Sequence, residues 1–304
     1  MTTFTKRVFG AVVVKAVNSN YNADFTGQPR TLPNGTSYAT DKAFKYTVRN
    51  FIRNFYPNEK IFYFRELKED MNPKTMEEKY KSLFPENNKT EERGDVIVNL
   101  LSCLDIRLFG ATYTGTKNAN VSIHGPVQIA HGVNLWKESN VYTEQITSPF
   151  SSTEGKEQTT IGRQSKLDEG HYLHHFSINP RNLDEIIHAT KVSGLTTDDI
   201  AKLKEGMRKG ATYYDSTSKV GTENELLIWV ELKEGSKLVL PSFLNLITVE
   251  NEKQDGRIIF DLTKLSDAIS KYRDQVDKVE IHVNNATAGL KGGPDNAILK
   301  DLLA

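Results

Sequence analysis

Residues 41–55, DKAFKYTVRNFIRNF, form the stretch that decides the fold, because their side chains separate into an apolar face and a basic face. At 100° per residue, the apolar side chains fall within one arc of about 100° and predict a helix packed on a core. Thr40 precedes this helix as its predicted N-cap. The apolar arc contains Phe44, Val48, Phe51, Ile52 and Phe55.

The basic face of the same helix indicates an anionic partner. It consists of Lys42, Lys45, Arg49 and Arg53, spaced by three, four and four residues. These positions fall within a second arc of about 80° on a different side of the helix. With no acid between them, the cations repel one another by roughly a few tenths of a kcal/mol per pair. A polyanion bound along this face would explain that cost, and a solvated helix face is the alternative.

The segments around this helix predict an α+β fold. KRVFGAVVVKAV, residues 6–17, is rich in β-branched side chains and predicts a strand before the helix. The order of core elements is strand, helix, strand, strand, helix, strand, which is the βαββαβ plan of ferredoxin-like and RNA-recognition-motif-like (RRM-like) folds. The later elements are a strand at 121–132 interrupted by Gly125 and Pro126, a strand at 171–178, a helix at 195–212 with Thr196 and Asp199 as a capping box, and a strand at 224–233.

Two insertions interrupt this plan, and we expect a single domain over residues 1–304. Residues 57–94 are polar and charged and predict a peripheral insertion, followed by a helix at about 95–104. Within 137–168, the runs NVYTEQIT and EQTTIGRQ are polar on both faces and predict a projecting hairpin. Residues 236–304 contain further strand and helix patterns whose role is not indicated by the sequence.

Composition and charge limit the function classes. The 304 residues are 38% hydrophobic and 26% charged, which is ordinary for a soluble protein. With 39 basic and 39 acidic side chains the formal net charge is zero. This balance argues mildly against nucleic-acid binding but does not exclude it, because phosphates respond to local basic stripes. No apolar run is long enough to cross a membrane and no secretory signal is visible, so we expect a cytoplasmic protein without membrane contact.

Three features resemble catalytic, metal or nucleotide sites, but each is better explained without such a site. In EGHYLHHFSI, residues 169–178, a strand would place His171 and His175 on one face and His174 on the other, so no face gathers all three for a metal. Cys103 has apolar neighbours and is predicted to be buried, not nucleophilic. TAGLKGGPDN lacks the ending of a P-loop. We therefore predict no catalytic residue, no metal and no cofactor.

Several segments together resemble the Cas7 family, the repeated backbone subunit of type I CRISPR Cascade complexes, and most closely its type I-B subgroup. NSNYNADFTGQPR, residues 18–30, is similar to the family's loop after the first strand, with Tyr21 and Ala23 in place of Pro and Gly. ATDKAFKYTVRNFI resembles the next helix, with Tyr46 where Arg is usual. DIRLFGA, HGPVQIAHG, EGHYLHHFSINP and STSKVGTENELLIWVEL follow in the expected order. The resemblance extends from about residue 8 to 235.

The resemblance implies an RRM-like palm, a helical finger insertion at 57–119 and a thumb hairpin at 137–168. It also implies copies stacked head to tail along a guide crRNA, contacts with other Cascade subunits, and pairing of target DNA with the guide. Binding would be independent of RNA sequence, because base pairing reads the sequence. The implied RNA-binding residues are Asn18, Asn20, Arg30, Lys42, Lys45, Arg49, Arg53, His124, Gln128, Arg163, Lys166 and Lys219, and the implied thumb wedges between bases are Ile146, Phe150 and Ile161.

Two other functions stay open at this stage. Type III relatives cut target RNA through an aspartate in the thumb, and here Asp168 lies only at the base of the predicted hairpin. A protein-only scaffold would assemble equally well without RNA. For the crRNA-binding function, we expect Lys45→Glu combined with Arg49→Glu to abolish RNA-dependent assembly and to leave the fold intact, because both side chains point away from the apolar arc.

Overall fold

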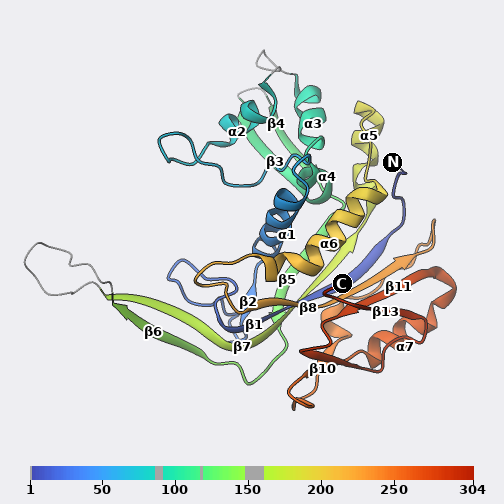
Figure 1. The fold of residues 1–304 in the computed structure, drawn as a ribbon. Coiled ribbons are helices and arrows are strands. Elements are labelled where there is room, and N and C mark those ends of the chain that lie inside the picture. Colours follow the sequence, from blue (N-terminus) through green and yellow to red (C-terminus); the bar gives the residue numbers. More distant parts are fainter. Residues whose placement is uncertain (1, 86–91, 117–118, 148–160) are drawn as a thin grey trace, which may run out of the picture.

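The computed structural model describes residues 2–85, 92–116, 119–147 and 161–304, with only the backbone described at 116, 119 and 161 (Figure 1). The helices are α1 (Asp41–Phe55), α2 (Met76–Leu83), α3 (Arg93–Leu101), α4 (Leu104–Phe109), α5 (Asp184–Thr190), α6 (Thr197–Tyr213) and α7 (Thr263–Lys271). The strands are β1 (Val8–Ser19), β2 (Tyr38–Ala39), β3 (Gly110–Thr116), β4 (Ala119–His124), β5 (Val127–Asn134), β6 (Val141–Thr147), β7 (Ile161–Ile178), β8 (Thr222–Leu232), β9 (Thr248–Val249), β10 (Ile258–Asp261), β11 (Val276–Val283), β12 (Ala288–Lys291) and β13 (Ala297–Asp301).

A large mixed sheet organises the molecule. Its strand order is β13-β11-β8-β1-β7-β5-β2, and β6 pairs with β7 outside this path. β1 lies antiparallel between β7 and β8, with Val12 opposite His174 on one side and Leu227 on the other. β11 and β13 add a parallel pair at one edge. The four central strands β8-β1-β7-β5 are connected through α1 and α6, which confirms the predicted order of strands and helices along the chain.

α1 and α6 pack together on one face of this sheet (Figure 1). The Thr40 hydroxyl accepts from the Ala43 amide at 3.3 Å, which confirms the predicted N-cap. Gly206 and Gly210 of α6 permit the close approach, because a Cβ on Gly210 would lie 2.8 Å from the carbonyl oxygen of Thr47. The apolar arc of α1 is buried except for Phe55, whose side chain is 54% exposed and was wrongly assigned to the core.

β7 contributes to separate cores on the two faces of the sheet. Tyr172 and Phe176 join the core beneath α1 and α6. Leu173 faces the opposite core, which packs against α7 and the small sheet of β9, β10 and β12. This alternation is the two-residue period predicted for 171–178. Each such buried side chain stabilises the fold by roughly 1.5–3 kcal/mol relative to exposure.

The segment between α1 and β5 forms its own small core from α2, α3, α4 and the β3–β4 hairpin. The helix predicted at 95–104 is confirmed as α3 but ends earlier, at Leu101, because the chain breaks at Ser102 and Cys103 before α4 begins. The predicted strand at 121–132 is in fact two strands that belong to different sheets, β4 and β5. They separate at Gly125, the position at which the sequence predicted an interruption.

The predicted hairpin projects from the sheet as β6 and the first part of β7 (Figure 1). Pairing runs from Val141 opposite Leu167 to Thr147 opposite Ile161. β7 then continues without a break into the centre of the sheet, so the hairpin and the strand at 171–178 are one element, not two. Within the described ranges, no helix is both long enough and apolar enough to span a membrane.

Candidate nucleic-acid interface

A cavity of about 710 Å³ lies between α1, the start of β3 and the turn from β4 to β5. It brings together five of the residues predicted to bind RNA, from two separate parts of the sequence. These five residues are Lys42, Lys45, Arg49, His124 and Gln128. Its wall also includes Asp41, Tyr63, Phe109 to Thr112, Ser122, Ile123, Gly125 and Asn182.

Arg49 is held at the wall of this cavity by a buried carboxylate. Its Nε donates to Oδ2 of Asp105 at 3.0 Å, and the Arg49 side chain is only 12% exposed. The amides of Phe62 and Tyr63 also donate to the Asp105 carboxylate, at 2.8 and 2.9 Å. The guanidinium lies 5.0 Å from the ring centroid of Phe109. Arg49 is therefore both a cavity residue and part of the packing between α1 and the following insertion.

Lys45 and Lys42 differ in how much of their charge is already compensated. Lys45 Nζ donates to Asp41 at 3.0 Å, whereas Lys42 is 86% exposed and lies 4.0 Å from the same carboxylate. Partial burial opposes ionisation of Asp41, but the hydrogen bond from Lys45 and the nearby cations outweigh it and lower the pKa of Asp41. The basic face therefore has two acidic partners from outside the run of cations, since Asp41 pairs with Lys45 and Asp105 pairs with Arg49.

The turn that carries His124 and Gln128 is shaped by contact between two backbones. A Cβ on Gly125 would lie 2.2 Å from the Gly110 amide nitrogen, and Gly110 has a positive φ of 77°. Gly125 is therefore needed for packing against the α4–β3 junction. Gln128 Nε2 and Asn182 Nδ2 both donate to the Gly125 carbonyl, at 2.7 and 3.1 Å.

A second group of predicted RNA-binding residues lies around the loop after β1, outside the cavity, with Asn18 near the end of β1, Asn20 in the loop and Lys219 shortly before β8. Asn20 is buried and its side chain donates to the carbonyls of Gly27 and Ser165, so this side chain is engaged within the protein. Lys219 Nζ donates to the carbonyls of Asn20 and Tyr21, and burial lowers the pKa of Lys219 to about 8. Asn18 is exposed and accepts from the Tyr142 hydroxyl.

The remaining basic residues and the predicted wedges are dispersed. Arg53 is exposed, with its guanidinium 4.5 Å from the Phe64 ring centroid, and Arg163 is exposed on β7. Lys166 pairs with Glu144 at 3.0 Å across the hairpin. Ile146 is 45% exposed on β6. Phe150 lies outside the described residues, and of Ile161 only the backbone is described.

The three histidines occupy two faces of β7, as predicted. His171 is buried between Glu225 and Glu169, where its ring nitrogens face both carboxylates. Burial opposes its charged form, but the two carboxylates outweigh burial and raise the pKa of His171. His174 stacks on Phe44 at 5.0 Å, and burial lowers the pKa of His174 to about 4. In the described part of the chain, no cluster of three His, Cys, Asp or Glu side chains has a geometry suited to a metal ion.

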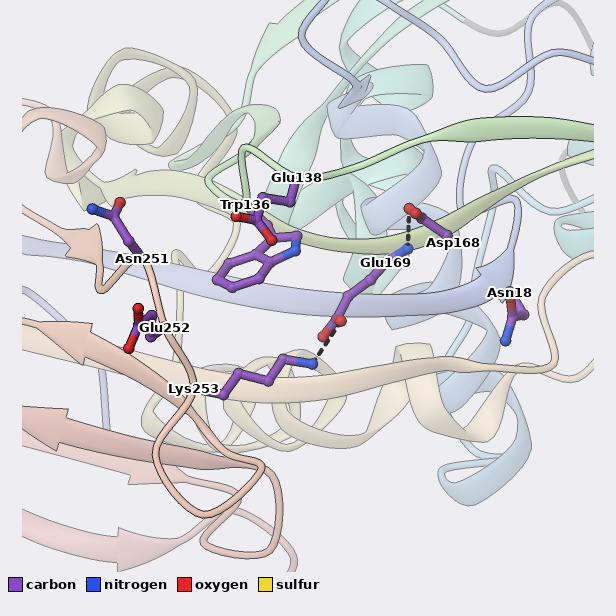
Figure 2. Close-up of a pocket in the computed structure, with 8 residues that line it drawn as sticks. All are labelled: Asn18, Trp136, Glu138, Asp168, Glu169, Asn251, Glu252 and Lys253. Carbon is purple, nitrogen blue, oxygen red and sulfur yellow. Dashed lines mark hydrogen bonds and ion pairs between the residues drawn. The ribbon is translucent and has the colours of Figure 1, made fainter.

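A second cavity, of about 640 Å³, lies at the base of the hairpin (Figure 2). Figure 2 shows Lys253 reaching from the C-terminal part of the chain to Glu169 on β7, at 2.6 Å. Asp168 accepts from the backbone amides of Asn140 and Glu169, at 2.7 and 2.6 Å, so its carboxylate closes the base of the hairpin. Glu138 and Glu252 add negative charge, and this cavity therefore disfavours phosphate.

Residues 6–277 match the family described as CRISPR-associated protein Cas7. The chain belongs to this family. No curated protein sequence matches it. It is similar to a chain of a "CRISPR RNA-guided surveillance complex, pre-nicking", with 13% identity, a TM-score of 0.59, and coverage of 97% of this chain and 96% of the other. A chain of a "CRISPR RNA-guided surveillance complex" has 12% identity, a TM-score of 0.50, and coverage of 93% and 95%. These identities establish a shared fold.

Several cavity residues of this Cas7 family member were not found from the sequence. The role of Asp41 could have been predicted, because an acid four residues before Lys45 on a helix is placed to pair with it. Tyr63 carried no such signal, and neither did Asp105, which pairs with Arg49 but does not line the cavity, since their contacts with Arg49 join positions far apart in the sequence. Asn182, near the end of β7, reaches the cavity only through the antiparallel pairing of β5 with β7.

Proposed function

We propose that this chain is the repeated backbone subunit of a type I CRISPR RNA-guided surveillance complex, of the I-B kind, and that it binds the guide crRNA without catalysing a reaction. The observation that carries the proposal is the cavity in which Lys42, Lys45 and Arg49 face His124 and Gln128. Cations and amide donors suit phosphate and ribose oxygens, which are the same at every nucleotide. Binding would therefore be independent of sequence and would weaken with salt.

In this proposal the parts of the fold have distinct roles within a single domain. The strands β8-β1-β7-β5 with α1 and α6 form an RRM-like palm, supported by their order and antiparallel pairing. Residues 57–119 form the finger, and the hairpin of β6 and β7 forms a thumb that reaches an adjacent part of the guide. Ile146 is the wedge that is exposed on β6, and Arg163 is an exposed cation on the opposite strand.

The proposed partners follow from family membership and from the shape of the fold. Copies of the chain would stack head to tail along one crRNA in the cytoplasm and bind other Cascade subunits at the ends of the stack. Target DNA would be recognised by pairing with the guide, since the protein leaves the base edges free. The projecting hairpin provides a surface through which one copy can reach the next.

The proposal is tested by Lys42→Glu, because Lys42 is exposed in the cavity and its replacement spares the buried contacts of α1. We expect wild-type protein to form RNA-length-dependent oligomers in native mass spectrometry, and Lys42→Glu to weaken RNA binding about tenfold. Lys237→Glu is the matched control, since Lys237 is exposed and distant in sequence from the cavity residues. Equal oligomer formation with and without RNA would favour the protein-only scaffold instead.

The ribonuclease alternative makes a separate prediction. If Asp168 were catalytic, protein with Mg²⁺ would cleave a complementary RNA, and Asp168→Asn would stop cleavage. We expect no cleavage from either protein, because the Asp168 carboxylate is engaged by two backbone amides and by the Asn140 side chain. Cleavage that depends on Asp168 would overturn the non-catalytic assignment.

A further inference from the structure

Phe25 stands fully exposed at the tip of a rigid turn. Its side chain is 103% exposed, the largest exposure among the large apolar residues of the described ranges. The turn is fixed by Asp24, whose Oδ1 accepts from the Thr26 amide, the Thr26 hydroxyl and the Gln28 amide at 2.7 to 3.0 Å. Pairing of Ala23 with Pro29 closes the loop behind the ring. The loop therefore presents Phe25 in a fixed position.

The same loop is braced against the hairpin proposed as the thumb. The Asn20 side chain joins the loop to Ser165 on β7, and Lys219 holds the carbonyls of Asn20 and Tyr21. Asn18, just before the loop, accepts from Tyr142 on β6. These contacts explain why the Asn20 side chain is buried and Lys219 is half-buried, although both were first expected to touch RNA directly. They fix the orientation of Phe25 relative to the hairpin.

The surroundings of Phe25 suit a nucleobase better than an apolar protein surface. Its sequence neighbours are polar, and the Arg30 guanidinium lies 5.9 Å from its ring centroid. Arg30 Nε is buried without a hydrogen-bond partner among the described residues. An aromatic ring beside a guanidinium matches a nucleotide, whose base stacks on the ring while its phosphate attracts the cation. A protein partner would more often meet a cluster of apolar side chains.

We propose that Phe25 stacks on a nucleobase of the bound RNA, with Arg30 beside the adjoining phosphate. This inference rests on the proposed RNA-binding function and adds a base-stacking contact to the phosphate contacts of the cavity. Because every base has a π-face, such stacking keeps binding independent of sequence. The contact would set the position of one base next to the hairpin, at a place that the cavity residues do not reach.

The test uses the full chain with short single-stranded RNAs that each carry one 2-aminopurine at a different position. We expect at least one position to be quenched on binding to wild-type protein and to Phe25→Tyr, and this quenching to be lost with Phe25→Ala. Loss of one stacking contact should weaken binding by about 5- to 150-fold. Val239→Ala, which alters another exposed apolar residue, should change neither the 2-aminopurine quenching nor the RNA affinity.

Two outcomes would overturn the inference while leaving the proposed function in place. In the first, Phe25→Ala binds RNA with wild-type affinity and shows wild-type quenching at every position. In the same experiment, Lys42→Glu binds RNA more weakly than wild type. The second is wild-type quenching by Phe25→Ala at every position together with loss of its RNA-dependent oligomers, which would assign the ring to a contact with a second copy of the chain. Failure of the proposed function has a different signature, since wild-type protein would then show no salt-dependent RNA binding. Unchanged thermal unfolding of Phe25→Ala is expected, because the ring is fully exposed.

Discussion

At the residue scale, Arg49 combines a structural contact with a place at the wall of the cavity proposed to bind RNA. A guanidinium that faces the cavity is also the partner of a fully buried carboxylate, Asp105. The sequence predicted the face of the helix on which Arg49 lies, because the periodicity of α1 is local. It did not predict Asp105 as the partner, since that contact forms only when the chain returns after 56 residues.

Arg49→Glu is expected to destabilise the protein, which corrects the expectation that Lys45→Glu with Arg49→Glu leaves the fold intact. The change would place a second carboxylate beside Asp105, which is completely buried. Breaking a buried pair of this kind costs about 3–5 kcal/mol. Urea unfolding should show this loss for Arg49→Glu and almost none for Lys42→Glu. A stability of Arg49→Glu within about 1 kcal/mol of wild type would refute the structural role of the pair.

Asp41→Asn is expected to strengthen RNA binding, because it releases Lys45 from its ion pair and removes a negative charge from the cavity wall. A gain of about two- to fivefold at low salt corresponds to roughly 0.5–1 kcal/mol. Fluorescence anisotropy with a short RNA can measure it. Asp295→Asn, an exposed acid elsewhere, is the control. Weaker RNA binding by Asp41→Asn would mean that Asp41 holds the Lys45 ammonium in the position from which it donates to the RNA.

His171 should make stability fall as the pH rises. Glu225 and Glu169 raise the pKa of His171 in the folded state despite burial. The free energy of unfolding that charged His171 contributes is therefore fully present below its unfolded-state pKa, near 6.5. This contribution is lost as the pH rises through the higher folded-state pKa. The free energy of unfolding of wild type minus that of His171→Gln should shrink between pH 6 and pH 9. A difference that is constant over this range, or that grows, would contradict a charged His171.

At the element scale, the predictions that succeeded depended on local pattern. The caps at Thr40 and Thr196 and the alternation in β7 were all predicted correctly. The helix break at Ser102 and the continuity of β7 through the hairpin were missed. Both depend on packing, because α4 is oriented by the buried Asp105, and the polar part of β7 is paired only with β6.

Shortening the hairpin should separate assembly from stability. Replacing residues 144–164 by a short Gly-Ser turn removes exposed side chains of β6 and keeps Ser165, which anchors the loop after β1. We expect the melting temperature to change by less than about 2 °C, which for a chain of this size corresponds to roughly 1 kcal/mol. RNA-dependent oligomers should be lost in size-exclusion chromatography. Normal oligomers from the shortened protein would exclude the hairpin from contacts between copies.

At the scale of the whole molecule, a formal net charge of zero conceals an uneven distribution of charge. The cavity beside α1 collects cations, and the cavity at the base of the hairpin collects Glu138, Asp168 and Glu252. The overall composition could not reveal this separation, because it arises only when distant segments come together. Such a distribution guides a polyanion toward one surface and away from the other.

The central claim is that phosphates of the guide lie in the cavity beside α1. It is tested most directly by the slope of log affinity against log salt, which for single strands changes by about 0.7 for each phosphate contact. The comparison is made between Asp41→Asn alone and Asp41→Asn with Lys42→Gln and Lys45→Gln, so that no carboxylate is left unpaired. A slope smaller by about 1.4 in the triple variant is the predicted result. Equal slopes, with Lys237→Gln as the reference surface change, would show that the RNA backbone binds elsewhere.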